Sequence, residues 1–280
     1  MRNLALVALL VMTGTAAAAE PTAKELDTRA AELTKKLDGQ GFTVLVEAPF
    51  VVVGNVTAKE VKSIATGFLR SKIKLMEKDF FAKRPDKLLE VWLFKGEKSF
   101  RAGAKKFFND TPDTPFGYYS PSANALIMNI NGLGTLSHEL VHPYMEANFT
   151  DVPSWFNEGL ASLFERPSER KGHIVGLANW RLPNLKKEIK KDTLPPLTKL
   201  IATKRDEFYE ASWDAYAQAR YLIFYLQEHD KLKEFYDEFH AHQDKDPTGK
   251  ASLEKVLGED LDTFDPKWRK WVMAVQGDNK

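Results

Sequence analysis

The spacing of apolar residues differs between the two halves of the chain. In the first half, short apolar or β-branched runs are bounded by Pro, Gly or Asn, a pattern typical of strands. These runs lie at 42–48, 50–55, 87–94 and 125–130. From residue 153 onward, apolar residues recur at helical spacing. The helices expected there are 154–165, 196–203, 210–229, 231–241, 251–257 and 266–275.

Helices are also expected among the strands of the first half. Thr22 with Glu25, and Thr57 with Glu60, have the spacing of a capping box, which marks the start of a helix. The expected helices are 22–37, 57–80 and 98–108. This order predicts an α+β fold in which a mixed sheet with helices precedes a mainly helical half. The expected divisions are an N-terminal helix at 20–41, an α/β subdomain at 42–150 and a helical subdomain at 151–280.

Residues 1–19 have the pattern of a secretory signal peptide. Arg2 precedes an apolar run at 4–12 and three alanines at 17–19, and the apolar run is too short to span a membrane. We expect cleavage after Ala19. The chain has no cysteine, so it must hold together without disulfides after export. The periplasm or the exterior of a bacterium is the expected location.

Charge and hydropathy argue against two classes of partner. The chain has 40 basic and 39 acidic residues, and this balance gives no electrostatic basis for binding nucleic acid. After the signal peptide, no apolar run reaches the roughly 18 residues that a membrane helix needs. We therefore expect no membrane segment in the mature chain. The sequence has no heptad pattern, and a monomer is the expected form.

Two of the six histidines lie four residues apart in the stretch "SHELVH", which is expected to be helical. On a helix, His138 and His142 share one face, so both rings can bind the same ion. Glu139 lies about 100° around the helix from His138, within reach of a water molecule bound to that ion. Two imidazoles, an oxygen ligand and one open position are typical of catalytic zinc. The motif therefore predicts a zinc centre.

Two glutamates compete for the role of third ligand. Glu158, in "PSWFNEGLASLFE", lies on the first turn of the next expected helix, and the connection is long enough for that helix to fold back. Glu146 continues the face of the histidines one turn further along their own helix. We favour Glu158, because Glu146 would lie too far along the axis if both rings aim at one point. Thr135 is the expected cap of the motif helix, and Pro143 is expected to kink it.

The motif followed by "WFNEGLA" resembles the gluzincin branch of zinc metallopeptidases, most closely the peptidase MA-like group. The similarity extends over roughly residues 50–275, and includes "GYYSPSANALIMNI", which is similar to the family's edge strand. It implies a thermolysin-like catalytic domain with the motif helix at the join of the two halves. Carried over residue by residue, it makes His138, His142 and Glu158 the zinc ligands and Glu139 the general base.

Peptide hydrolysis at such a centre needs further groups. A second donor opposite the metal would stabilise the oxyanion; from the helix that the family packs beside its cleft, Tyr216 is the first candidate and Arg220 the second. Each histidine ligand also needs an acceptor for its other ring nitrogen. Asn157, Glu165 and Asp151 are available for that role, and the sequence does not rank them.

The resemblance predicts a periplasmic or secreted zinc-dependent peptidase that acts on peptides or proteins. The substrate would pair, backbone to backbone, with 125–130 as the edge strand. Two alternatives are a catalytically silent binding or scaffold protein on the same fold, and a zinc hydrolase that acts on a non-peptide bond. His240 and His242 lie at an expected helix end, where their rings would point roughly 200° apart, so we expect no second metal site there.

Overall fold

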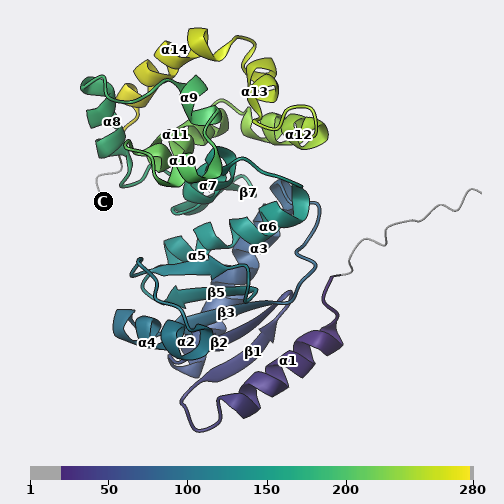
Figure 1. Cartoon of the computed structure of the whole chain (residues 1–280). Helices are drawn as coiled ribbons and strands as arrows, with labels where there is room; N and C mark the ends of the chain where they lie inside the picture. Colours follow the sequence, from purple (N-terminus) through teal and green to yellow (C-terminus); the bar gives the residue numbers. More distant parts are fainter. Residues whose placement is uncertain (1–19, 278–280) are drawn as a thin grey trace, which may run out of the picture.

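A five-stranded mixed sheet forms the first half of the protein (Figure 1). The computed structural model describes residues 20–277, so the predicted signal peptide at 1–19 lies outside the described residues. The strands cross the sheet in the order β1-β2-β3-β5-β4. The three central strands are parallel, and the two outer strands pair antiparallel with their neighbours. The strands are β1 (Thr43–Glu47), β2 (Phe50–Gly54), β3 (Leu89–Phe94), β4 (Gly117–Ser120) and β5 (Ala125–Asn129).

Helices cover both faces of this sheet, which explains why its central strands are almost entirely apolar, with Glu90 and Asn129 as the polar exceptions. Side chains alternate between the two faces of a strand, and every residue of β2, β3 and β5 is buried. One face packs against α1 (Ala23–Lys36) and α4 (Glu97–Phe108). The other face packs against α2 (Ala58–Ser63), the π-helical turn η1 (Ile64–Leu69), α3 (Arg70–Asp79), α5 (Leu133–Glu139) and α6 (Val141–Asn148).

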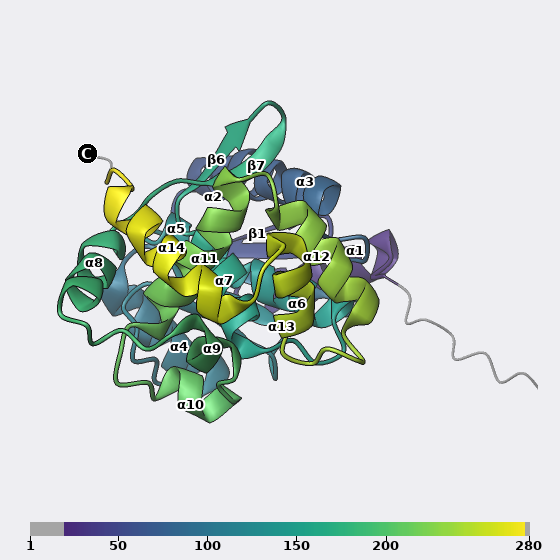
Figure 2. The same ribbon diagram turned by 90° about the horizontal axis from the view of Figure 1, so that it is seen from above.

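The second half is mainly helical and packs on the far side of α5 and α6 (Figures 1 and 2). A small hairpin, β6 (Pro167–Arg170) with β7 (His173–Gly176), projects at its side. One apolar core runs from the sheet into this half and includes Val52, Leu126 and Leu222. The helices are α7 (Ser154–Leu163), α8 (Leu182–Lys190), α9 (Leu197–Ile201), α10 (Arg205–Tyr209), α11 (Ala215–Glu228), α12 (Leu232–His242), α13 (Lys250–Leu257) and α14 (Leu261–Ala274).

The predicted α+β class, with a mixed sheet before a helical half, is confirmed. Both predicted capping boxes are present: the hydroxyls of Thr22 and Thr57 each accept from the backbone amide three residues on, at 3.3 Å. Between residues 20 and 277, no helix has both the length and the apolar character that crossing a bilayer requires.

Two predictions about the motif region are wrong. The segment 125–130 is not the edge of the sheet, because β5 is paired on one side with β3 and on the other with β4. The edge strand is β4, which precedes β5 in the chain. The motif helix begins at Leu133 with Gly132 as its N-cap, so Thr135 lies inside the helix and does not cap it.

Candidate metal centre

The His-Glu-x-x-His motif spans the junction of α5 and α6, between the sheet and α7 (Figure 1). His138 lies in the last turn of α5 and His142 in the first turn of α6, with Leu140 between the two helices. Pro143 has no amide proton to donate to the carbonyl of Glu139, which accounts for an interruption at this point. The two rings nevertheless lie with their centroids 5.0 Å apart.

Glu158 reaches the two histidines from the first half of α7. Its Oε2 lies 3.2 Å from Nε2 of His138 and 3.9 Å from Nε2 of His142. Glu139 joins the group, since His138, Glu139 and His142 each offer a ligand atom within 4.8 Å of the others. The structure therefore brings together the three predicted ligands and the predicted base.

Two glycines allow the helices to approach closely enough for this convergence. A Cβ at Gly159 would lie 3.1 Å from the carbonyl oxygen of Ala219 in α11. A Cβ at Gly134 would lie 2.4 Å from the carbonyl oxygen of Glu165, just after α7. A side chain at Gly134 would force α5 away from α7, so the glycine holds His138 and Glu158 in the same layer.

Carboxylates determine the charge of the centre. Burial lowers the pKa of His138, but the carboxylates of Glu158, Glu165 and Glu139 outweigh burial and raise that pKa to about 10. Burial raises the pKa of Glu158, but His142 and His138 outweigh it and lower that pKa to about 2. The centre therefore stabilises a positive charge, whether on an imidazole or on a bound cation.

One oxygen indicates that the residues suit a metal ion. Oε1 of Glu158 accepts from the hydroxyl of Tyr209 at 2.6 Å, whereas the buried Oε2 has no hydrogen-bond partner among residues 20–277. A buried carboxylate oxygen without a donor is costly, and this one faces Nε2 of both histidines. Two imidazole nitrogens and a carboxylate oxygen form a ligand set that zinc accepts. The group can hold a metal ion.

The other nitrogen of each ring faces an oxygen acceptor. Nδ1 of His142 lies 3.1 Å from Oδ1 of Asn157, and Nδ1 of His138 lies 3.6 Å from Oε1 of Glu165, just beyond hydrogen-bond length. Arg181 anchors Glu165 through two hydrogen bonds, at 2.6 and 2.9 Å. These partners turn both Nε2 atoms towards Glu158, as metal-ligating histidines require.

Glu165→Gln is expected to lower zinc affinity about 10- to 100-fold. The substitution removes the negative charge that faces Nδ1 of His138, and it weakens the hydrogen bonds by which Arg181 holds this side chain. The measurement is the zinc Kd from competition with a chromophoric chelator, with circular dichroism confirming the fold. Glu169→Gln, at an exposed position of β6, is the matched control. An affinity within twofold of the parent for Glu165→Gln would show that Glu165 does not support the ligand.

The rival ligand Glu146 and the acceptor candidate Asp151 lie elsewhere. Glu146 is exposed, and its Oε2 accepts from the hydroxyl of Tyr119 at 3.1 Å. Asp151 is exposed in the loop before α7 and forms no hydrogen bond or ion pair with either histidine within the part of the chain that the structure describes. The geometry favours Glu158 over Glu146.

Glu139 is held at the free edge of the sheet. Its Oε2 accepts from the backbone amide of Tyr119 in β4 at 3.0 Å, and lies 3.7 Å from Nε2 of His142. That amide points away from β5, the only strand partner of β4 among residues 20–277. The carboxylate therefore stands between the two imidazoles and the edge strand.

Arg220 is not available to a substrate, contrary to its place as second candidate for the oxyanion donor. It is fully buried, and its Nε and Nη2 donate to the backbone carbonyls of Ser162 and Leu177. Burial lowers its pKa to about 10. Arg220 ties α11 to the end of α7 and to the segment after β7.

Two tyrosines lie beside Glu158. Tyr216, the first oxyanion candidate, packs its ring on Tyr209 at 6.2 Å; burial raises its pKa, as does the charge of Glu158. Its catalytic role remains a prediction. Tyr209, which donates to Glu158, was missed, because "KRDEFYE" reads as a solvated face and the five-residue α10 has little signal of its own.

His240 and His242, where no second metal site is expected, lie in different surroundings. The ring of His240 packs on Phe149 at 5.3 Å and on Tyr236 at 6.2 Å. His242 directs Nδ1 to the carbonyl oxygen of Glu238 in the preceding turn of α12. The two rings face different partners.

One family model matches the chain. It is described as "Protein of unknown function (DUF1570)" and covers residues 132–249. This segment begins at the N-cap of α5 and contains the whole centre, including Glu165, Tyr209 and Tyr216, while it leaves out the sheet. No curated protein matches the chain.

Proposed function

We propose that the protein is a zinc-dependent metallopeptidase of the gluzincin type, built on a thermolysin-like catalytic domain. The observation that carries the proposal is the position of Glu158 on a separate helix. Its Oε2 has no hydrogen-bond partner within residues 20–277 and lies 3.2 and 3.9 Å from Nε2 of His138 and His142. These three residues are the proposed ligands. The resemblance of "HELVH" and "WFNEGLA" to the peptidase MA-like group supports the same assignment.

Glu139 is the proposed general base. When bound, zinc lowers the pKa of a water ligand and polarises a carbonyl group. The amide of Tyr119 holds the carboxylate of Glu139 beside His142, where Oε2 can take a proton from the attacking water. The same oxygen can then pass this proton to the leaving amine.

The proposed substrate is a peptide or protein segment in extended form along β4. Strand β4 is paired only with β5 among the described residues, so the outward backbone groups that Glu139 does not occupy can pair with another strand. Tyr119 lies at this edge, and Phe116 just before it is half exposed. Tyr118 contacts Phe100 on the opposite face of the sheet, so it does not line the site.

Tyr216 remains the proposed donor to the oxyanion. Its neighbour Tyr209 already donates its hydroxyl to Glu158, and therefore serves to position the ligand. No hydrogen bond from the Tyr216 hydroxyl is found within residues 20–277, and Glu158 and Glu139 are both close enough to raise its pKa. A hydroxyl in that position can donate to charge that develops on a substrate carbonyl.

The proposal includes export and a monomeric form. The pattern of residues 1–19 directs the chain out of the cytoplasm, and cleavage after Ala19 leaves Glu20 as the first residue. The enzyme then acts in the periplasm or outside the cell. The charge balance of the chain favours no nucleic-acid partner.

Metal removal tests this function. Protein treated with a chelator is expected to lose peptide hydrolysis, and about one equivalent of zinc per chain is expected to restore it. The assay is release of quenched fluorophores from a mixed peptide library. Zinc-loaded protein that cleaves only ester or amidase substrates would indicate a hydrolase for a non-peptide bond. Zinc-loaded protein that hydrolyses neither would indicate a binding or scaffold protein.

A further inference from the structure

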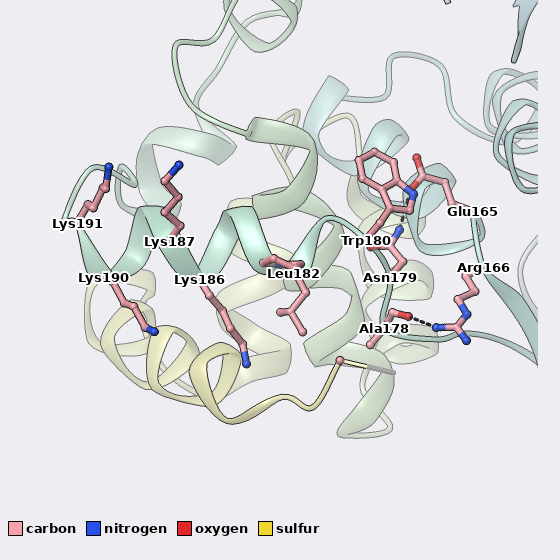
Figure 3. Close-up of a pocket in the computed structure, with 12 residues that line it drawn as sticks. Glu165, Arg166, Ala178, Asn179, Trp180, Leu182, Lys186, Lys187, Lys190 and Lys191 are labelled. Atoms are coloured by element: carbon pink, nitrogen blue, oxygen red, sulfur yellow. Dashed lines mark hydrogen bonds between the residues drawn. The ribbon is translucent and has the colours of Figure 1, made fainter. Parts of the chain in front are cut away.

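A pocket of about 910 Å³ adjoins the metal centre on the side of Glu165 (Figure 3). Trp180 forms part of its wall and is 69% exposed, which is unusual for so large an apolar side chain. Basic side chains form a large part of the rest of the wall, and four of them are lysines from α8 and its C-cap. They are Lys186, Lys187, Lys190 and Lys191.

These lysines form a concentration of positive charge, and one of them, Lys186, donates to the backbone carbonyl of Val275 at 2.6 Å. Lys186 with Lys190, and Lys187 with Lys191, are spaced four residues apart, and the two pairs point to opposite sides of α8 (Figure 3). Like charges at that spacing destabilise a helix. Within residues 20–277, none of the four pairs with a carboxylate. The one acid of α8, Glu188, instead accepts from the backbone amide of Asp214.

The pocket shares its wall with the metal centre. The guanidinium of Arg181 lies 4.2 Å from the ring centroid of Trp180 and 5.1 Å from that of Tyr216. Arg181 also binds Glu165, which lines the pocket and faces His138. The charge of Glu165 is thereby offset, so the pocket offers a net positive surface on the Nδ1 side of His138.

We propose that this pocket binds an acidic segment of the peptide substrate, several residues from the scissile bond. The inference rests on the proposed peptidase function. The nine residues of α8 span about 13 Å, which matches about four residues of extended peptide. Lysine ammonium groups on flexible stems suit carboxylates at variable spacing, and Trp180 supplies an apolar contact at the end nearest the centre.

Binding is measured separately from cleavage. Full-length zinc-loaded Glu139→Gln protein is titrated into two labelled peptides that differ only in carrying four glutamates or four glutamines, and the Kd is read by fluorescence anisotropy. We expect preference for the glutamate peptide, and a loss of about tenfold in that preference when Lys187→Glu and Lys190→Glu are added. The matched control, Lys59→Glu with Lys62→Glu on exposed positions of α2, changes the net charge equally and is expected to keep the preference.

Three results would overturn the assignment. In the first, the glutamate and glutamine peptides bind equally well. In the second, the control substitutions in α2 remove as much of the preference as the substitutions in α8. In the third, a sulfated oligosaccharide of equal charge binds more tightly than the glutamate peptide, and the substitutions in α8 abolish that binding. The last result would assign the pocket to an anionic glycan. Cleavage is blocked in this assay, so binding and hydrolysis are tested separately. If the variant prefers the acidic peptide but the parent protein hydrolyses no peptide, the peptidase function would be excluded, while the assignment of the pocket as an acidic-peptide site would remain.

Discussion

Glu139→Gln is expected to lower kcat/KM for peptide hydrolysis by about 10²- to 10⁴-fold, the usual contribution of a positioned general base. Glutamine has the same shape, and its carbonyl oxygen can still accept from the amide of Tyr119, which now holds Oε2 at 3.0 Å. It cannot take a proton. Steady-state kinetics on the best library peptide measure the loss.

Zinc content distinguishes this effect from damage to the site. Glu139→Gln is expected to retain the zinc of the parent, because Glu139 is the proposed base and not a ligand. Glu169→Gln, with the same chemical change at an exposed position, should leave kcat/KM unaltered. Full activity of Glu139→Gln would exclude Glu139 as the base, and loss of zinc would make it a ligand.

Glu158→Ala is expected to weaken zinc binding by about 10²- to 10³-fold, if about 10–16 kcal/mol for a four-ligand zinc site is divided among its ligands. The variant removes the oxygen that faces Nε2 of His138 and His142. It also leaves the hydroxyl of Tyr209 without its acceptor. The zinc Kd is measured by competition with a chelator, and peptide hydrolysis should fall in parallel at limiting zinc.

Glu146→Ala provides the contrast, since Glu146 was the rival ligand on the histidines' own helix. It is exposed and contacts Tyr119, so zinc affinity should stay at the parent value. If zinc were lost from Glu146→Ala and kept by Glu158→Ala, the third ligand would be Glu146. The helix α6 would then have to move from the position it has in this structure.

The parts of the fold that were predicted carry strong local signals. The runs that form β2, β3 and β5 are apolar at nearly every position, with Glu90 and Asn129 as the polar exceptions, because helices cover both faces of the sheet. The capping boxes at Thr22 and Thr57 provide hydrogen-bond partners for backbone amides within one helical turn, so they can be recognised from the sequence without knowledge of the tertiary structure. The spacing of His138 and His142 is equally local, and the structure places both rings together.

Besides the nine-residue helix α8, the elements that were missed are short and depend on distant contacts. Strand β4 has four residues and exists because β5 pairs with it, so the sequence shows only the turn between them. The hairpin of β6 and β7 turns at Lys171 and Gly172, both with positive φ, but its first strand is polar. Helix α10 has five residues, too few to be stable alone.

The surroundings of the ligands could not be ranked from sequence, because they are set by packing between helices. Asn157 and Glu165 face the histidines because α7 lies across α5, and that crossing requires the missing side chain at Gly134. Asp151 is nearer in sequence to His142 than Asn157 is, yet it lies in an exposed loop. Only the tertiary arrangement separates these candidates.

The zinc content of the unaltered mature protein tests the central claim most directly. The protein is dialysed against zinc at neutral pH, freed of loose metal on a desalting column, and assayed by mass spectrometry for metal per chain. The account predicts about one tightly held zinc ion per chain, because two imidazoles and one carboxylate meet at one point. A folded protein that retains no zinc, and no other divalent metal offered in its place, would contradict the metal centre and the peptidase function with it.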